Sequence, residues 1–522
     1  MKKLVKNEGQ FDSFAQKELS IIREIMPDAH IEHIGSTAIP GAETSGVIDI
    51  MVGLDKALEI VKYFNGLDAA GYSTKDDAHL AGRKFLVKTT DEYKVHLSII
   101  KYNSEMWKNY ITIRDYLRQN EEDLARYNLL KLQCLETCPE DYLKQRSEFK
   151  LSILHKIDRL TNRIERKNLT HATLEELSKK YKVPMHDLYF IYLNISGLNT
   201  TIDFPRLRMR VQLVGSDEVF YFGLANRPQS PFRLVDKQIW FEDRHIADVV
   251  FIENDDCASS YFRKNKTVIT LNSNRRSTCT GCKFCPNNLE LNSDDLNLDT
   301  EEKLVKHFEM LMEQVDKKDL SFLERITVCT GCFNSESKAV DHMILVSETA
   351  KKMGFDGVIH YIGSEIKTTE AMQRIKENIK TFMITFTVEC FTNRYLILRG
   401  TKASLTLDVY KKLMCKAREH GFIVNYIYIL GLDNLEDVLK NIEELKDFVS
   451  YFPSVNVFQP HVADHDDLVS SDAYCNLEYY LIVRKKFEDL YNGTGIKPHS
   501  WECYRPLWYY YYDGKFSEEI RI

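Results

Sequence analysis

Hydrophobic and polar positions change their period along the chain, and each change predicts a different kind of element. Apolar residues at helical spacing in residues 11–25 predict an opening amphipathic helix. Basic and apolar residues alternate in residues 204–214, as they do in a half-buried strand. From residue 266 onward, short β-branched runs alternate with amphipathic segments, of which 407–420 and 435–452 are the clearest helices. The pattern predicts an α/β protein.

The second half of the chain carries a series of strand candidates separated by helical segments. They are residues 267–271, 325–328, 357–362, 382–388, 423–430 and 455–459. Parallel strands with helical crossovers bring all the loops that follow the strands to one edge of the sheet. Residues 266–522 are therefore predicted to form a partial (β/α)6 barrel. Its aromatic extension, residues 499–512, either completes the core or covers the active site, and core packing is favoured.

Three cysteines follow the first of these predicted strands at intervals of three. Cys279, Cys282 and Cys285 form a CxxCxxC pattern, which can turn its thiolates toward one metal centre. Three thiolates leave one position open, either on a zinc ion or on one iron of a 4Fe-4S cluster. An open position indicates chemistry, whereas CxxC pairs also occur in structural zinc sites.

This arrangement resembles the radical S-adenosylmethionine (SAM) superfamily, whose three cysteines follow the first barrel strand and leave the fourth iron of a 4Fe-4S cluster to bind SAM. Phe284, just before the last cysteine, fits that superfamily. The usual spacing is CxxxCxxC, so the first interval here is one residue shorter. The resemblance implies reductive cleavage of SAM and an electron donor such as flavodoxin or ferredoxin. The short interval leaves hydrogen abstraction and 3-amino-3-carboxypropyl transfer both open.

The resemblance extends to later loops and implies a set of SAM contacts. Residues 387–394 are similar to lipoyl and biotin synthases, which makes Glu389 the candidate for binding the ribose hydroxyls. The implied contacts are Phe284, Thr330, Gly331, Glu389, Arg399, Lys402, Leu430 and Gly431. Cys329 and Cys332 form a further CxxC pair, which either binds a second cluster or consists of two small buried residues.

The first 160 residues carry a different set of motifs. Gly35 and Ser36 form a turn after a predicted strand, and such turns offer backbone amides and a hydroxyl to a phosphate. Asp49, on the next predicted strand, has the carboxylate that Mg2+ would need beside that phosphate. Together with residues 95–100 and 142–150, these motifs resemble the GrpB family of the nucleotidyltransferase fold. The resemblance implies an α+β nucleotidyltransferase-like domain in residues 1–160.

The same resemblance implies a phosphate or nucleotide site. Its residues are Gly35, Ser36, Asp49 and His96, with His33 and Arg114 nearby. An active nucleotidyltransferase generally carries a second carboxylate two residues after the first, and this chain has Met51 there. Because one carboxylate supplies too few ligands for two-metal catalysis, we expect recognition of a nucleotide or phosphate rather than its transfer.

Residues 161–265 are predicted to form a small α+β connector. A helical hairpin in residues 167–192 is compatible with a helix-turn-helix module, but a connector between domains is favoured. Arg206, Arg208 and Arg210 alternate with apolar residues and are expected to form an exposed positive stripe. Such a stripe either meets the phosphates of a nucleotide or RNA, or protects an edge strand.

Length, charge and hydrophobicity limit the kinds of partner that the protein is expected to have. The chain has 522 residues, too many for one core, and a formal net charge of -7, which gives no overall attraction to nucleic acid. No run approaches the ~20 apolar residues of a membrane span, and the first residues lack the apolar segment of a signal peptide. A cytoplasmic protein with reduced cysteines and no membrane partner is expected.

Two functions remain open on the residues alone. The first is a radical SAM enzyme acting on a small-molecule substrate, possibly nucleotide-like or phosphate-bearing. The alternative is a zinc-stabilised nucleotide or nucleic-acid-binding protein without catalysis. The two differ in the metal that the cysteines bind.

Overall fold

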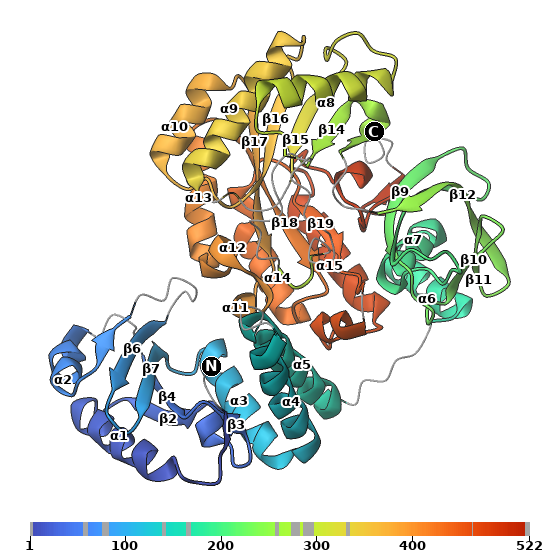
Figure 1. Ribbon diagram of the computed structural model, residues 1–522. Helices are drawn as coiled ribbons and strands as arrows, with labels where there is room; N and C mark the ends of the chain where they lie inside the picture. The colour runs from blue at the N-terminus through green and yellow to red at the C-terminus, as the bar shows by residue number, and fades with distance from the viewer. Residues whose placement is uncertain are drawn as a thin grey trace. The chain divides into compact units, whose positions relative to one another are not determined.

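A computed structural model of the chain divides into two compact units, shown in Figure 1. The first unit comprises Met1–Asn162 with Thr392–Ser404, and the second comprises Arg163–Phe391 with Leu405–Ile522. The structure describes residues 4–55, 61–75, 83–137, 142–162, 169–255, 260–272, 282–285, 297–329, 333, 335–461 and 463–516. Each unit has a sheet and a core of its own.

The first unit is built on a five-stranded sheet in the order β2-β4-β7-β6-β5. Its strands are β2 (His30–Ile34), β4 (Val47–Leu54), β5 (Ser73–Thr74), β6 (Lys84–Thr89) and β7 (Lys94–Lys101). Strands β4 and β7 are parallel, and the other pairs are antiparallel. A short antiparallel pair, β1 (Val5–Lys6) and β3 (Glu43–Thr44), lies outside this sheet.

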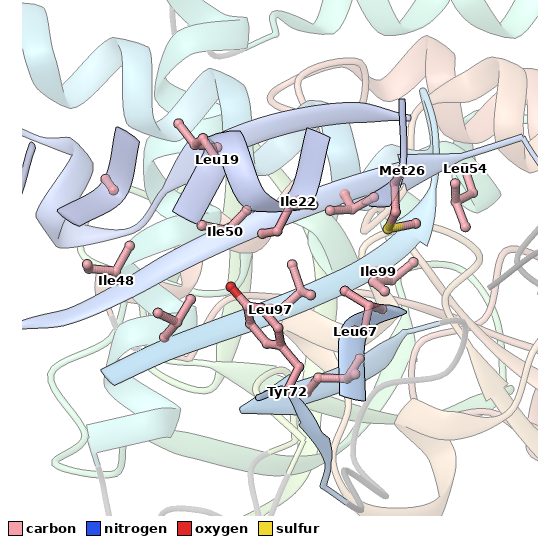
Figure 2. Close-up of a cluster of buried hydrophobic side chains, with 14 of the residues drawn as sticks. Leu19, Ile22, Met26, Ile48, Ile50, Leu54, Leu67, Tyr72, Leu97 and Ile99 are labelled. Atoms are coloured by element: carbon pink, nitrogen blue, oxygen red, sulfur yellow. The ribbon is translucent and has the colours of Figure 1, made fainter. Parts of the chain in front are cut away.

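Alternate residues of β4 face two different cores because side chains alternate across a strand. Ile48 and Ile50 pack against α1 (Asp12–Ile25), as Figure 2 shows with Leu19 and Ile22 of that helix. Met51 faces the opposite side, where it packs with Trp107 of α3 (Glu105–Gln119). The same side also holds α4 (Glu121–Thr137) and α5 (Tyr142–Asn162). The predicted opening helix is confirmed, and Asp49 is left on the α3 side of the sheet.

The second unit begins with two helices and an antiparallel sheet in the order β10-β11-β12-β8-β9. These elements are α6 (His171–Tyr181), α7 (Met185–Ser196), β8 (Arg206–Leu213), β9 (Val219–Ala225), β10 (Phe232–Val235), β11 (Gln238–Phe241) and β12 (Arg244–Asn254). Phe190 of α7 is buried with its ring centroid 5.0 Å from that of Phe222 on β9. Helix α7 is therefore a core helix and is not available as an exposed recognition helix.

The prediction of an exposed arginine stripe in residues 206–210 is wrong. Strand β8 lies between β12 and β9 rather than at an edge, and Arg206 and Arg208 are only 6% and 5% exposed. Both guanidinium groups donate to the buried carboxylate of Asp255. The alternating pattern identifies two faces of a strand, but here both faces are covered, because Asp255 supplies the counter-charge that lets the arginines be buried.

The second half of the unit contains a seven-stranded sheet, coloured yellow-green to orange in Figure 1. Its strands, in spatial order, are β13 (Tyr261–Arg263), β14 (Val268–Leu271), β15 (Arg325–Val328), β16 (Val358–Gly363), β17 (Phe382–Glu389), β18 (Ile423–Leu430) and β19 (Ser454–Val457). From β14 to β19 each strand pairs in parallel with the next in the chain. All six predicted strands are confirmed, and the sheet curls into a half-barrel (Figure 1).

Helices connect these parallel strands, and each begins at a residue of the type that the sequence favours there. They are α8 (Glu301–Glu313), α9 (Glu336–Lys352), α10 (Thr369–Asn378), α13 (Leu407–Glu419) and α14 (Leu435–Leu445). Their N-cap residues are Thr300, Ser335, Thr368, Thr406 and Asn434, whose side chains accept a backbone N–H of the first turn. Such caps satisfy amides that have no partner inside the helix, which fixes where each crossover starts.

The aromatic tail lies in the core, as favoured from the sequence. After α15 (Leu477–Tyr491), Trp508 and Tyr509 are 2% and 1% exposed, and Tyr509 packs against Phe190 at 5.0 Å between ring centroids. The tail ends in a small hairpin, β20 (Tyr511–Tyr512) and β21 (Lys515–Phe516). The short helices α11 (Arg394–Ile397) and α12 (Gly400–Ser404) belong to the first unit, as does α2 (Phe64–Ala69). In the described part of the chain, no helix combines the length and apolar character of a bilayer span.

A buried ion pair fixes the tail to α7. Arg484 of α15 donates to Asp187 at 2.9 Å and to the carbonyl of Leu507 at 2.7 Å, and the Arg484 and Asp187 side chains are 2% and 0% exposed. Asp187 also accepts the backbone N–H of Tyr510 at 3.1 Å. One buried carboxylate thus connects a helix near the start of the unit to both the tail and α15.

We predict that Arg484→Met destabilises the protein strongly, because it leaves the carboxylate of Asp187 buried without its counter-charge. Breaking a buried pair in this way costs about 3–5 kcal/mol. The neighbouring Lys485, whose side chain is 46% exposed beside Asp489 and Asp513, provides the control. Lys485→Met should change the free energy of unfolding by about 1 kcal/mol or less. Denaturant midpoints followed by tryptophan fluorescence test both, and equal effects would contradict the assigned role.

Candidate functional site

The turn after β2 brings a glycine and a carboxylate into direct contact in the first unit. Gly35 has φ +75°, and a Cβ built there would lie 2.3 Å from Oδ2 of Asp49. Only glycine permits both this backbone conformation and this approach. Ser36 starts the 3-10 turn Ser36–Ala38, is buried, and donates its hydroxyl to Thr44 at 3.0 Å. The structure therefore brings Gly35, Ser36 and Asp49 together, as expected.

His96 completes the expected group because β4 and β7 are in register. Asp49 pairs with His96 across the parallel strands, and Nδ1 of His96 lies 3.4 Å from Oδ1 of Asp49. Burial alone would raise the pKa of Asp49, but the hydrogen bond from His96 and the charge of Arg146 lower it below its usual value. Asp49 is therefore ionised at neutral pH.

Two residues expected nearby are engaged elsewhere. Arg114 donates to Glu32 at 2.6 Å and to Asp115 at 2.8 Å, so its charge is neutralised away from Asp49. His33 bonds the hydroxyl of Thr37 at 3.0 Å, and burial lowers its pKa to about 4. Both side chains stabilise the turn rather than offer a free contact to a ligand.

Three cations that sequence reasoning missed lie close enough to interact electrostatically with Asp49. Arg146 and Lys150 lie four residues apart on α5, hence on one face of that helix, and Arg83 precedes β6. Burial and the charge of Arg146 depress the pKa of Lys150 well below its usual value, and burial lowers the pKa of Arg83. The helical spacing of Arg146 and Lys150 was the only signal in the sequence.

This arrangement offers more positive charge than negative. The ammonium group of Lys150 lies 4.2 Å from the ring centroid of Tyr110, and it makes no ion pair within the described ranges. Met51, where a second catalytic carboxylate would stand, is fully buried against Trp107. The site therefore suits an anionic ligand better than a pair of metal ions.

In the second unit, two of the three clustered cysteines lie on one tight turn beyond β14. The backbone N–H of Cys285 donates to the carbonyl of Cys282 at 3.0 Å, and Cys282 is 6% exposed. Such an i to i+3 turn brings its end residues within metal-binding distance of a common centre. Phe284 lies on the same turn and is half-buried. Cys279 lies outside the described residues.

Glu389 lies at the end of β17 in an unusual conformation. Its φ is +65°, its side chain is buried, and the register between β17 and β18 shifts just before it. A left-handed backbone at a residue other than glycine is strained and is common at functional sites. Leu430 ends the neighbouring strand β18, and Gly431 follows with φ +117°. These three predicted contacts therefore lie at one edge of the sheet.

The remaining predicted SAM contacts stay predictions. Thr330, Gly331 and Cys332 lie outside the described residues. Arg399 and Lys402 lie in the segment Thr392–Ser404 of the first unit, and their assignment to SAM stays a prediction. Arg399 donates to the carbonyl of Leu398 at 3.1 Å.

Sequence reasoning missed an acid that fixes the loops after β17 and β18. Asp433 accepts the hydroxyl of Tyr428 at 2.8 Å and the backbone N–H of Phe391 at 2.9 Å. The rings of Phe391 and Tyr428 stack with centroids 4.5 Å apart. One carboxylate thus positions an aromatic pair at the edge that also holds Glu389.

A row of polar side chains crosses one face of the parallel sheet. His360 of β16 bonds Thr327 of β15 at 3.1 Å and Thr385 of β17 at 2.7 Å. Thr385 donates to Asn425 of β18, which donates to the carbonyl of Phe452 at 2.9 Å. Burial and the charge of Arg325 keep the pKa of His360 well below its usual value, so the row is neutral. A buried polar network whose hydrogen bonds are all made is rigid, so this row fixes how the four strands lie beside one another.

The first unit is thus a mixed α/β domain with a glycine turn, an ionised aspartate and clustered cations on one side of its sheet. A family model described as GrpB protein matches residues 3–156. The glutamate-rich protein GrpB of Alkalihalophilus pseudofirmus is 30% identical over 164 residues, which are 30% of this chain and 94% of that protein. Through this region the chain belongs to the GrpB family, which confirms the resemblance seen in the sequence.

Two further matches cover similar shares of the chain. A UPF0157 protein of Vibrio cholerae is 32% identical over 128 residues, covering 24% of this chain and 67% of that protein. The crystal structure of the conserved protein GrpB from Enterococcus faecalis matches with a TM-score of 0.27 and 21% identity, covering 30% of this chain and 99% of that one.

We predict that Gly35→Ala destabilises the first unit, because the new Cβ meets both an unfavourable φ and the carboxylate of Asp49. Gly41 has nearly the same φ, +77°, but only ordinary contacts, 3.5 Å or more, around its position. Gly41→Ala should therefore cost about 1 kcal/mol from backbone strain, and Gly35→Ala clearly more. Adding Asp49→Ala to Gly35→Ala should recover part of the loss in denaturant midpoint. No recovery in the double variant would exclude the contact as the cause.

Proposed function

We propose that the second unit is a radical SAM enzyme module whose cysteines Cys279, Cys282 and Cys285 bind a 4Fe-4S cluster. The observation that carries the proposal is the parallel pairing of β14 to β19 in chain order, with the cysteine turn following the first of these strands. In this topology every loop that follows a strand lies at one edge of the sheet. The cysteine turn, Glu389 and Gly431 then border one site.

The residues present fit such a group. Cys282 and Cys285 share a turn closed by a 3.0 Å backbone hydrogen bond, which keeps their thiols on one loop. When bound, the cluster supplies the electron that breaks a sulfur–carbon bond of SAM. The buried carboxylate of Glu389 provides acceptors for the two ribose hydroxyls. The neutral row through His360 is hydrogen-bonded within the sheet, so it adds polar groups to the half-barrel without adding charge.

The substrate and the electron donor are specified only by chemical class. The proposed substrate is a small molecule of the nucleotide-like or phosphate-bearing class, and the proposed donor is a flavodoxin or ferredoxin. The zinc-stabilised alternative loses part of its basis, because Arg206 and Arg208 are buried and do not offer a stripe to nucleic acid.

We expect anaerobic protein supplied with iron and sulfide to acquire the visible absorbance of a 4Fe-4S cluster, and to cleave SAM when dithionite is added. Cys282→Ser and Cys285→Ser should abolish both properties, because each removes a cluster ligand. Cys415 is exposed on α13 and serves as the control, since Cys415→Ser should retain both. Analysis of the SAM fragment distinguishes 5'-deoxyadenosine from methylthioadenosine. Uptake of zinc alone would favour the binding protein without catalysis.

A second function is favoured by the cations around Asp49. We propose that the first unit binds a phosphate-bearing ligand, nucleotide or free phosphate group, without transferring it. The supporting observation is that Arg83, Arg146 and Lys150 all interact electrostatically with one carboxylate, that of Asp49. Burial and the charge of Arg146 lower the pKa of Lys150, and a bound phosphate would oppose both effects, whereas two metal ions would find too few ligands.

We predict that the protein binds a nucleoside triphosphate equally well with Mg2+ and with EDTA, and releases no pyrophosphate. Lys150→Met should weaken binding by about tenfold or more, as loss of a charged hydrogen bond does. Lys108→Met on α3 is the matched control, because Lys108 is exposed and should leave the affinity unchanged. Calorimetric titration measures these affinities. Binding that requires Mg2+, or any pyrophosphate release, would contradict recognition without transfer.

A further inference from the structure

A buried histidine without a hydrogen-bond partner follows the last strand of the half-barrel. His461 is 7% exposed, and among the described residues neither of its ring nitrogens has a partner. Buried polar groups are nearly always hydrogen-bonded, and the exceptions occur where a ligand or another function uses the group. The two nitrogens of His461 therefore indicate a missing partner.

The segment that carries His461 is firmly placed. The side chain of Gln459, fully buried, accepts the backbone N–H of Ala225 at 2.5 Å and donates to the carbonyl of Asn194 at 2.7 Å. These bonds connect the end of β19 to α7 and β9 within the same unit. Because the chain is fixed two residues before His461, the position of the imidazole is set by the fold rather than by a loose loop.

The surroundings of His461 are cationic. Burial lowers the pKa of His461 well below its usual value, and Arg206, Arg505, His465 and Arg227 act in the same direction. The ring of His465 lies 5.7 Å from that of His461. The imidazole is therefore neutral, with one N–H donor and one acceptor nitrogen.

Three carboxylates also lie in this region, and each accepts hydrogen bonds from an arginine. Asp255 accepts from Arg206 at 2.5 Å and from Arg208 at 3.2 Å. Asp466 accepts two hydrogen bonds from Arg227, at 2.8 and 3.0 Å. Glu253 accepts from Arg208 at 3.1 Å.

Arg505 contacts main-chain carbonyls. It donates to the carbonyl of Val457 at 2.8 Å and to that of Gly223 at 2.9 Å. A guanidinium group has five N–H donors, so binding one carboxylate or two carbonyls leaves it able to bind an oxyanion as well.

A pocket opens beside this group. Arg227, Asp466, Pro460, Phe458 and Tyr480 line it, and Pro460 directly precedes His461. Apolar rings and a few charged groups on one wall are typical of a site for a small molecule. The pocket lies next to the end of β19, at the same edge of the sheet as Glu389 and Gly431.

We propose that His461, together with the guanidinium groups of Arg206 and Arg227, binds an oxyanion group of a small molecule. The neutral imidazole donates its N–H to the oxyanion, and the guanidinium groups supply the positive charge. The anion site itself rests on the buried imidazole of His461, which has no partner among the described residues, and on the adjacent pocket lined by Arg227. Its further assignment, to an acidic group on the substrate of the second unit, rests on the radical SAM function proposed above.

The test uses thermal unfolding of the full chain carrying Lys150→Met, which removes the phosphate site of the first unit. Inorganic phosphate and succinate serve as separate probes, so a shift with phosphate alone or with succinate alone identifies the group. We expect one of them to raise the unfolding midpoint. Adding Arg227→Met should reduce that rise.

His461→Leu separates binding from a structural role. Because it removes a buried polar group that has no partner, it should raise the ligand-free midpoint and abolish the shift caused by the anion. His420→Leu is the control: His420 bonds the carbonyl of Lys416 at the end of α13, so its loss should leave the shift intact. The proposal is overturned if neither anion shifts the midpoint, or if His461→Leu lowers the ligand-free midpoint and keeps the shift.

These outcomes are independent of the cluster, because unfolding is measured without iron, sulfide or SAM. A protein that binds the anion but assembles no cluster would refute the enzyme function and keep the anion site. A protein that assembles the cluster and cleaves SAM but binds neither anion would refute the anion site and keep the enzyme function.

Discussion

The parallel hydrogen bonding from β14 to β19 is the constraint on which the second unit depends. Each strand pairs with the next one in the chain, so every crossover must run over the same face, and every strand ends at the same edge. Residues that are far apart in sequence, such as Cys282, Glu389 and His461, follow strands of one sheet for this reason. A change of order at any one strand would move its loop away from that edge.

Buried charge complements this hydrogen-bond network. Arg325, at the start of β15, pairs with Glu502 of the tail at 2.9 Å, and Arg484 pairs with Asp187 of α7. Hydrogen bonds from Arg325 and Tyr451 lower the pKa of Glu502 to about 2, although burial alone would raise it. Both pairs join segments of the second unit that are distant in sequence. Removing one partner leaves an isolated buried charge, so these pairs specify how strand, helix and tail meet.

Local patterns predicted the elements of the protein well. The strand runs 325–328 and 423–430 coincide with β15 and β18, because β-branched and aromatic residues favour a pleated, buried surface wherever they lie. The crossover helices begin where Thr, Ser or Asn can accept an N–H of the first turn. The turn of Gly35 and its partner Asp49 were also found, because a strand, a glycine turn and a second strand are close in the chain.

What the sequence did not predict depends on contacts between distant residues. Arg206 and Arg208 were expected outside, and nothing near them in the chain indicates that both donate to Asp255. Arg83 approaches Asp49 from the start of β6, whereas Arg146 and Lys150 approach it from α5. The role of Asp433 requires Tyr428 and Phe391 to be adjacent in space. Periodicity identifies the faces of an element, but burial and charge pairing are decided by the partner that packs there.

The two candidate sites share one electrostatic property despite the net charge of -7 for the whole chain. Around Asp49, and again around His461, cations are gathered within a partly buried volume, and the proton affinity of a neighbouring base, Lys150 or His461, is reduced. Gathering like charges costs free energy in the absence of a ligand, and binding an anion recovers it. The overall negative charge does not cancel this local positive charge, because exposed charges are screened within about 10 Å. The two proposed sites therefore call for the same class of ligand, an acidic small molecule, by the same electrostatic argument.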